Sequence, residues 1–273
     1  STQTITNGID LSGKGGLLWI KKRTIAADPH CLFDTARGNT KRLSTNATSA
    51  QTTITDEVTA FNSSGFSLGS GANGYTNSTG DTLVSWTFRK QAKFFDVVTY
   101  EGNTYDVNAS RAIAHNLGSV PGTIIVKPTD ASSSWRVYHR SLGATKAIYL
   151  EGALAADTNI YAWQNTEPTS SVFTVGYDSN TSGTTYVAYL FAHDAGGLAA
   201  LVHVVRLMPE ERARLRVGRR LAVEQTGRGR QGKQQQKRGA AKAQLGRDDA
   251  GHHRAQQARG PNLGAVVPPR LAL

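Results

Sequence analysis

The chain has 273 residues, with 31 Lys and Arg against 20 Asp and Glu, which gives a formal net charge of +11. Residues 1–197 contain 15 basic and 15 acidic residues, and all 21 aromatic residues lie among them, so residues 198–273 carry the whole excess charge. This division excludes a uniformly basic nucleic-acid-binding domain and separates a neutral body from a basic tail.

The composition of the body favours β-structure. Ser and Thr make up 48 of its 197 residues, a mixture typical of strands joined by tight turns. Cys31 is the only cysteine, so stability must come from packing and hydrogen bonds instead of an intrachain disulfide. The apolar run Leu198–Met208 is interrupted by His203 and Arg206 and is too short to span a bilayer, so no membrane insertion is expected.

Taken in chain order, the body reads as a series of strands. The segment Thr82–Phe88 alternates apolar and polar residues: Val84, Trp86 and Phe88 are separated by Ser85 and Thr87. We expect the apolar residues to form the buried face of a strand. Phe94–Tyr100 is a second β-rich run. Tyr186–Phe191 is apolar at every position, as in a strand covered on both faces. Within the body, Lys146–Asp157 is the one segment for which we consider a helix.

Five segments recur in the same order, at an offset of 103 to 107 residues. The matched pairs are Leu18–Lys21 with Ile124–Lys127, Phe33 with Tyr138, Gly38–Lys41 with Gly143–Lys146, Gly65–Gly69 with Val172–Gly176, and Thr82–Phe88 with Thr185–Phe191. Such order and spacing indicate an internal duplication.

The duplication predicts three regions: a first β repeat at 1–92, a second at 93–197, and a basic, low-complexity tail at 198–273. Each half is expected to be too small to shield its own apolar face and to close over the other. Phe94–Tyr100 precedes the second repeat and has no counterpart before the first, so we expect its counterpart upstream of Ser1. The predicted fold class is all-β, an antiparallel β-sandwich built from two homologous repeats and followed by a helical or disordered basic tail.

Several segments together resemble an uncharacterised β domain of tailed-phage structural proteins, over about residues 5–196. They are Trp19–Arg23, Leu32–Lys41, Trp86–Lys90, Phe94–Tyr100, His115–Gly122, Tyr138–Gly143 and Tyr186–Asp194.

The resemblance implies a non-enzymatic virion module of the tail or tail fibre, assembled in the host cytoplasm. It implies other virion subunits as partners, with a homo-oligomer expected, or contact with a host-surface glycan. Two alternatives stay open, a carbohydrate-binding domain of a receptor-binding protein and a polysaccharide depolymerase. The family has no established catalytic residues, so it transfers none to this chain.

The sequence contains no recognisable catalytic, cofactor or metal site. Gly38 and Gly143 each precede a Thr-Lys pair, yet the full phosphate-binding-loop pattern is missing, and we interpret both as structural turn glycines. His115, His139 and His193 lack the spacing of metal ligands. The four Glu of the body form no recognisable pair for glycoside hydrolysis.

Four residues are candidates for ligand contact: Trp135, Tyr138, His139 and Trp163. Together they could form an aromatic platform for a sugar ring. The competing interpretation is that they are core or rim residues of a β domain.

Three interpretations of residues 198–273 stay open. One is a translation in the wrong reading frame of a GC-rich gene, the second a solvated tail, and the third a nucleic-acid-binding arm in which Arg and Lys neutralise phosphates. Binding of RNA by base stacking is disfavoured because the tail has no aromatic residue.

Overall fold

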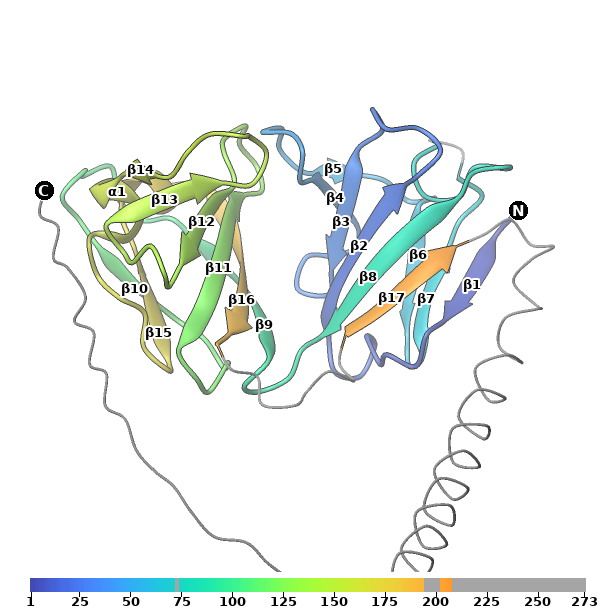
Figure 1. Cartoon of the computed structure of the whole chain (residues 1–273), viewed down its shortest axis with the longest axis horizontal. Coiled ribbons are helices and arrows are strands. Elements are labelled where there is room, and N and C mark those ends of the chain that lie inside the picture. The colour runs from blue at the N-terminus through green and yellow to red at the C-terminus, as the bar shows by residue number, and fades with distance from the viewer. Residues whose placement is uncertain (72–73, 194–201, 208–273) are drawn as a thin grey trace, which may run out of the picture. The chain divides into compact units, whose positions relative to one another are not determined.

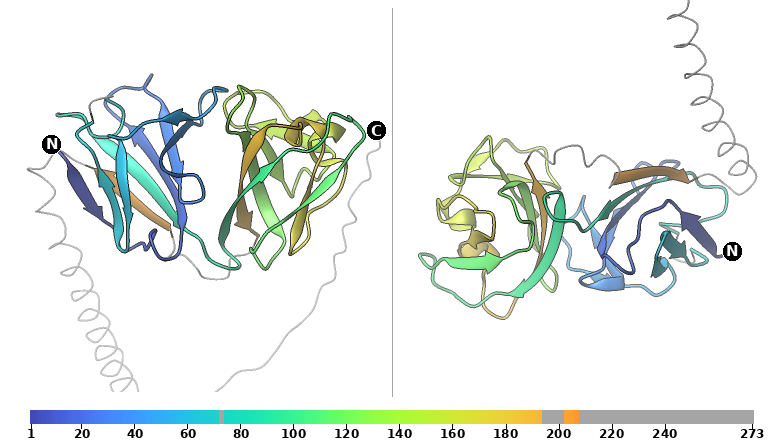
Figure 2. Two further views of the ribbon diagram at one scale, coloured as in Figure 1. Left: turned by 180° about the vertical axis from the view of Figure 1, so that it is seen from behind. Right: turned by 90° about the horizontal axis from the view of Figure 1, so that it is seen from below.

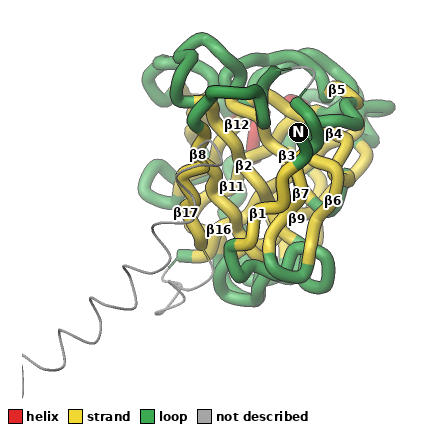
Figure 3. The backbone as a smooth tube through the Cα atoms, turned by 90° about the vertical axis from the view of Figure 1, so that its right-hand side faces the viewer, coloured by secondary structure: helices red, strands yellow, loops and turns green. Residues whose placement is uncertain are grey.

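Strands make up nearly all of the regular secondary structure in this computed structural model, which describes residues 1–71 and 74–193 and the backbone of 202–207 (Figures 1 and 3). These residues belong to one compact unit, Ser1–Arg214. The first half of the body contains β1 Gln3–Thr6, β2 Gly16–Lys22, β3 His30–Asp34, β4 Gly38–Ser44, β5 Thr52–Thr53, β6 Val58–Asn62, β7 Gly65–Leu68 and β8 Leu83–Arg89. After it come β9 Phe95–Glu101, β10 Arg111–Ala114, β11 Pro121–Pro128, β12 Arg136–His139, β13 Lys146–Tyr149, β14 Asp157–Thr158, α1 Ile160–Trp163, β15 Val172–Val175, the 3-10 turn η1 Tyr177–Ser179, β16 Thr185–Ala192 and β17 Val202–Leu207.

Two six-stranded antiparallel sheets share one strand order. The first-half sheet runs β17-β8-β2-β3-β4-β5, and the second-half sheet runs β9-β16-β11-β12-β13-β14. Strands that correspond by the sequence offset take corresponding places, so β2 matches β11 and β8 matches β16. The fold is therefore the expected antiparallel β-sandwich of two homologous repeats. The expected boundary between residues 92 and 93 falls in the loop that joins β8 to β9.

Each half also has a small sheet that covers one face of its large sheet. In the first half it is β1-β7-β6, seen as a separate layer from behind in Figure 2, and in the second it is β10-β15. Between the layers of the first half lie Ile20, Phe33 and Phe66, whereas Ile124, Tyr138 and Phe173 lie between those of the second. The expectation that neither half shields its own apolar face was wrong, because the two-layered arrangement buries a core inside each half.

A third apolar cluster joins the two halves. It brings Leu17, Leu32 and Leu43 of the first half together with Trp135 and Tyr189 of the second. Strand β16 therefore contacts two cores: Tyr186, Ala188 and Leu190 face the core of its own half, and Val187 and Tyr189 face the joint. The prediction that this strand is covered on both faces is confirmed.

The orientation predicted for β8 was wrong. Ser85 and Thr87 are fully buried, whereas Trp86 and Phe88 are half-buried. The small polar side chains face the core of the first half, where Asn7 donates a hydrogen bond to the Thr87 hydroxyl over 3.0 Å. Trp86 lies on the other face, with its ring centroid 6.0 Å from that of Trp19. The hydrogen bond compensates the burial of the hydroxyl, which allows a polar residue on the inner face.

The edge strands β9 and β17 take equivalent places in the two large sheets. β9 follows β8 along the chain but pairs with β16, and β17 follows β16 but pairs with β8. The registers correspond as well, since Phe95 pairs with Phe191 and the equivalent Val202 pairs with Phe88. In the first-half sheet the place equivalent to that of β9 is thus taken by β17, which follows the second half along the chain. Strand β17 also lies within residues 198–273, the segment predicted to be a helical or disordered tail. Residues 208–273 are outside the described residues.

The helix considered at Lys146–Asp157 is absent. Lys146–Tyr149 forms β13, in which Tyr149 pairs with Arg136 and Ile148 with Val137. A short α-helix occurs later, at Ile160–Trp163, where the Asn159 side chain accepts a hydrogen bond from the backbone N–H of Tyr161. Among the described residues, no helix is long and apolar enough to cross a membrane.

Candidate functional site

The four expected ligand-contact residues do not form an exposed platform. Trp135, Tyr138 and Trp163 are buried, with at most 2% of each side chain exposed, and His139 alone is exposed. The structure brings Tyr138 and Trp163 together at 6.0 Å between ring centroids, in the core of the second half. Trp135 lies in the cluster that joins the halves. Gly38 and Gly143 have positive φ angles of 100° and 73°, as turn glycines do.

Trp135 connects the second half to a loop of the first. Its indole N–H donates to the carbonyl oxygens of Ser44, at 3.2 Å, and Ala47, at 3.0 Å. Two residues earlier in the chain, the backbone N–H of Ser133 donates to the carbonyl of Thr48 over 2.9 Å. This tryptophan is therefore an anchor of the joint between the halves.

A buried ion pair and a tyrosine form a second connection. Arg37 Nε lies 2.7 Å from Asp34 Oδ2, and the Tyr189 hydroxyl donates to the same oxygen over 2.7 Å. The other oxygen of Asp34 accepts the backbone N–H groups of Ala36 and Arg37. Burial, the Asp34 charge and the hydrogen bond to Asp34 raise the pKa of Tyr189 well above its usual value, although Arg37 opposes the shift.

Equivalent lysines at the ends of β2 and β11 are each held by three backbone carbonyls. Lys21 Nζ donates to the carbonyls of Ile25, Ala26 and Asp28. Lys127 Nζ donates to those of Pro128 and Ala131 and to that of Thr48 in the other half, the last at 3.1 Å. Burial lowers the pKa of Lys127 to about 8. The repeated sequence thus produces a repeated structural device, which in the second half also joins the two halves.

Three of the four glutamates of the body are engaged by neighbouring groups. Glu57 forms a 2.7 Å ion pair with Arg42. Glu151 accepts the backbone N–H of Trp135 over 3.0 Å. Glu167 accepts the Tyr138 hydroxyl and, over 2.7 Å, the backbone N–H of Ala144. These carboxylates therefore hold the fold together, instead of facing one another across a cleft.

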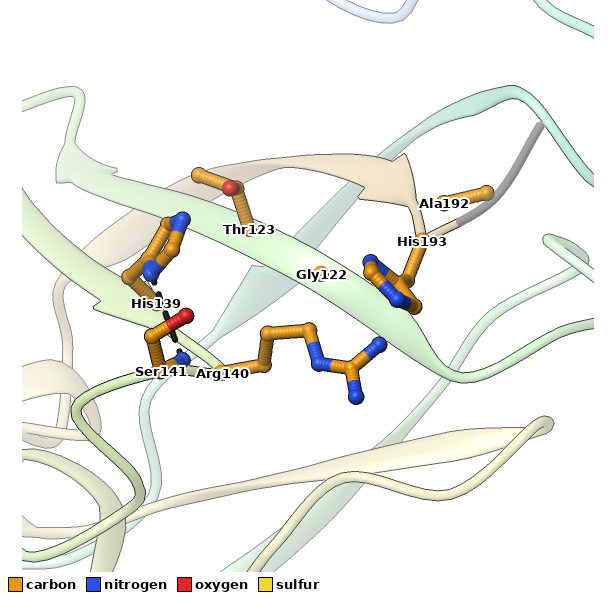
Figure 4. Close-up of a pocket in the computed structure, with 7 residues that line it drawn as sticks. All are labelled: Gly122, Thr123, His139, Arg140, Ser141, Ala192 and His193. Carbon is orange, nitrogen blue, oxygen red and sulfur yellow. Dashed lines mark hydrogen bonds between the residues drawn. The ribbon is translucent and has the colours of Figure 1, made fainter. Parts of the chain in front are cut away.

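A surface pocket of about 370 Å³ lies on the second half, where β11, β12 and β16 meet (Figure 4). We call it the Arg140 pocket. In Figure 4 the Arg140 side chain extends from the turn after β12 toward the end of the pocket where His193 lies. Its lining residues are Gly122, Thr123, His139, Arg140, Ser141, Ala192 and His193.

Backbone contacts hold the pocket in place. The N–H of Arg140 donates to the carbonyl of Gly122 over 2.9 Å, which ties the turn after β12 to the start of β11. At Gly122 the pairing of β11 with β16 shifts register. A side chain at this position would meet the Cβ atom of His193 at 3.2 Å, so glycine leaves room for the close approach of His193.

Of the residues that line the pocket, the sequence predicted only His139 as a ligand contact. Thr123, Arg140 and His193 lie up to 70 residues apart, and no spacing rule joins them. The one local signal was the consecutive His139-Arg140-Ser141. Among the described residues, no group of three or more His, Cys, Asp and Glu side chains could hold a metal ion.

Residues 1–199 match the model of a family described as domain of unknown function DUF7483. Because the match covers well over half of its length, the chain belongs to this family. No curated protein matches the chain, and no solved structure does.

Proposed function

We propose that the body is a non-enzymatic structural module of a phage particle, part of the tail or a tail fibre. In this role it assembles with other virion subunits, including copies of itself, or contacts the host surface. The observation that carries the proposal is the use of buried polar groups at the joint between the halves. Asp34, Arg37, Lys127 and Trp135 all bond across or beside this joint.

Polar groups that are buried and bonded to one another suit a structural protein better than an enzyme. A catalytic site needs an acid, base or nucleophile that can reach a substrate. Here the Asp34–Arg37–Tyr189 cluster is buried, and its donors and acceptors satisfy one another. A polysaccharide depolymerase would need two facing carboxylates about 5–10 Å apart, and Glu57, Glu151 and Glu167 are each engaged elsewhere.

The virion setting rests on the sequence resemblance described above, which includes Trp86–Lys90 and Phe94–Tyr100. The structural role is supported by the buried polar contacts that join the two halves. A carbohydrate-binding role remains the alternative, and it now depends on the exposed His139 and its pocket, because Trp135 and Trp163 are buried.

Mass spectrometry of particles purified from cells that encode the chain tests the proposal. Peptides from residues 1–193 should co-purify with the particles through density-gradient centrifugation, in a constant ratio to the other particle proteins. If the chain is abundant in the lysate and absent from intact particles, the virion role is wrong. Size-exclusion chromatography with light scattering of the isolated chain tests for the expected homo-oligomer.

A further inference from the structure

We propose that the Arg140 pocket binds an oxyanion carried by a small molecule of about monosaccharide size. The group recognised is a carboxylate, a phosphate or a sulfate. The inference does not depend on the virion role, because it concerns a surface of the second half alone.

The size of the pocket suits such a ligand. Its volume of about 370 Å³ is near the lower end of the range of about 300–1,000 Å³ that small-molecule sites occupy. It is made by the ends of β11, β12 and β16, three adjacent strands of one sheet. Sheet pairing therefore fixes the backbone at Thr123, His139 and Ala192. The hydrogen bond from the Arg140 N–H to the Gly122 carbonyl ties the turn after β12 to this frame.

The donor set of the pocket suits an anion. Arg140 is exposed, and within the described part of the chain its guanidinium has no ion pair. A guanidinium presents paired N–H donors that match the oxygens of a carboxylate or phosphate. The hydroxyls of Thr123 and Ser141 are further donors, and none of the lining residues is acidic.

His139 adds a donor through its tautomer. Its Nδ1 accepts the backbone N–H of Ser141 over 3.3 Å, as the dashed line in Figure 4 marks. An imidazole whose Nδ1 accepts a hydrogen bond carries its proton on Nε2 when it is neutral. The ring is therefore a donor through Nε2, and its exposure leaves this atom accessible to a ligand.

The first half provides an internal comparison. At the place equivalent to His139 it has Asp34, whose carboxylate is already bound by Arg37. At the place equivalent to Arg140 it has Thr35, whose hydroxyl accepts the backbone N–H of Gly16 over 2.9 Å. In the first half this turn thus carries a carboxylate that is already bonded, whereas in the second half it carries an exposed arginine and an exposed histidine. Of the two turns, the one in the second half therefore has the chemistry of an anion site.

Nuclear magnetic resonance titration of the full chain tests the proposal. The ¹H–¹⁵N spectrum is followed in 150 mM KCl at constant pH as inorganic phosphate, glucuronate or glucose is added. We expect phosphate and glucuronate to shift the amide signals of Thr123 and Ser141 in a saturable way. Glucose, which matches glucuronate in size without its charge, should leave these signals in place.

Two variants separate specific binding from general attraction to a basic chain. Arg140→Gln should weaken the binding of both anions at least about tenfold, the effect of losing a charge-assisted hydrogen-bonded pair. Arg23→Gln is the matched control: it removes an exposed arginine of the first half, so the affinity should stay unchanged. Both side chains are exposed, so neither change threatens folding.

The relative affinities of the two anions test which ligand the pocket binds. Tighter binding of glucuronate than of phosphate supports the proposal and identifies an acidic sugar as the ligand class. Equal or weaker binding of glucuronate shows that the pocket recognises the oxyanion without the sugar ring, and it overturns the proposed monosaccharide-sized ligand. Failure of both anions to shift Thr123 and Ser141 overturns the proposal. An equal loss of affinity in the Arg23 and Arg140 variants, or an equal response to glucose and glucuronate, overturns it as well.

Discussion

The hydroxyl of Tyr189 donates a 2.7 Å hydrogen bond to the carboxylate of Asp34 across the joint between the two halves. Both side chains are buried, with at most 1% exposed. Tyr189→Phe should lower the free energy of unfolding by about 1–3 kcal/mol, because a buried carboxylate oxygen loses a donor. Urea unfolding measures this. Tyr149→Phe, which removes an exposed hydroxyl bonded to Asp157, is the control and should cost less. Equal losses would contradict the assigned role of Tyr189.

The buried tyrosines predict a loss of stability in alkali. Burial raises the pKa of Tyr100 and of Tyr189 well above 10. In the unfolded chain these groups lose their protons near pH 10. Above that pH the folded state holds more protons than the unfolded one, so their contribution is complete below pH 10 and decreases as the pH rises further.

Urea unfolding at pH 8, 10 and 11 should therefore show a smaller alkaline decrease in Tyr100→Phe than in the wild type. Tyr105→Phe is the control, since the Tyr105 side chain is 71% exposed. A decrease of equal size in the wild type and the Tyr100 variant would rule out this source of alkaline sensitivity.

The two equivalent lysines should differ in their effect on stability. Lys127→Met leaves the carbonyls of Thr48, Pro128 and Ala131 without their shared donor, at a cost of about 1–3 kcal/mol. Lys21→Met should cost less, because Lys21 is less buried and its carbonyl partners can bind water. Calorimetric unfolding of both variants measures the difference, and a larger loss at Lys21 would contradict it.

The lowered pKa of Lys127 gives a pH dependence of definite sign. Between its folded pKa of about 8 and its ordinary value of 10.5, the folded state binds fewer protons than the unfolded one. The contribution of this group to stability is therefore complete above pH 10.5 and is lost as the pH falls through 8. The free energy of unfolding of the wild type, minus that of Lys127→Met, should rise from pH 8 to 10.5. A flat difference would show that burial does not disfavour the charge.

Removal of β17 should destabilise the first half. A chain that ends at residue 193 leaves the edge of β8 without its partner strand, and an open sheet edge invites pairing with another chain. We expect a lower urea midpoint and more self-association by light scattering than for a chain that ends at residue 207. Identical behaviour of the two truncated chains would show that β17 contributes nothing to the first-half sheet.

Cys31 should be unreactive in the folded protein. Its side chain is fully buried, and burial, as the largest cause, raises the pKa of the thiol to about 12. Thiol reagents act on the thiolate, so an aromatic disulfide reagent should react at pH 8 only after denaturant is added. Complete reaction within minutes in native buffer would show that the first-half core opens readily.

The sequence predicted the equivalent strands correctly because its signals are local. The alternation of Thr82–Phe88, the continuous apolar run of Tyr186–Phe191 and the glycines of the turns each act through neighbouring residues. It failed on which face of β8 points inward. Trp86 and Phe88 look like core residues, and yet they face the side of the sheet opposite its small partner layer. There Trp86 lies against Trp19, and Phe88 packs at the edge of the cluster that joins the halves, so both stay partly exposed.

The candidate site was less predictable than the fold. Trp135 and Trp163 are of the residue type that binds sugar rings, which made them candidates. Only the packing of the folded chain shows that both side chains are buried. The Arg140 pocket is invisible in the sequence, since Gly122, Arg140 and His193 come together only when β11, β12 and β16 pair.

The sequence by itself determined the β class, the duplication and the separation of a neutral body from a basic tail, because these follow from periodicity, order and composition. The tertiary structure alone decided that β17 returns to complete the sheet of the first half, that Asp34 binds Tyr189, and that one of two equivalent turns opens into a basic pocket. Those outcomes depend on contacts between residues about 15 to 155 positions apart, and no local preference specifies which distant segment supplies the partner.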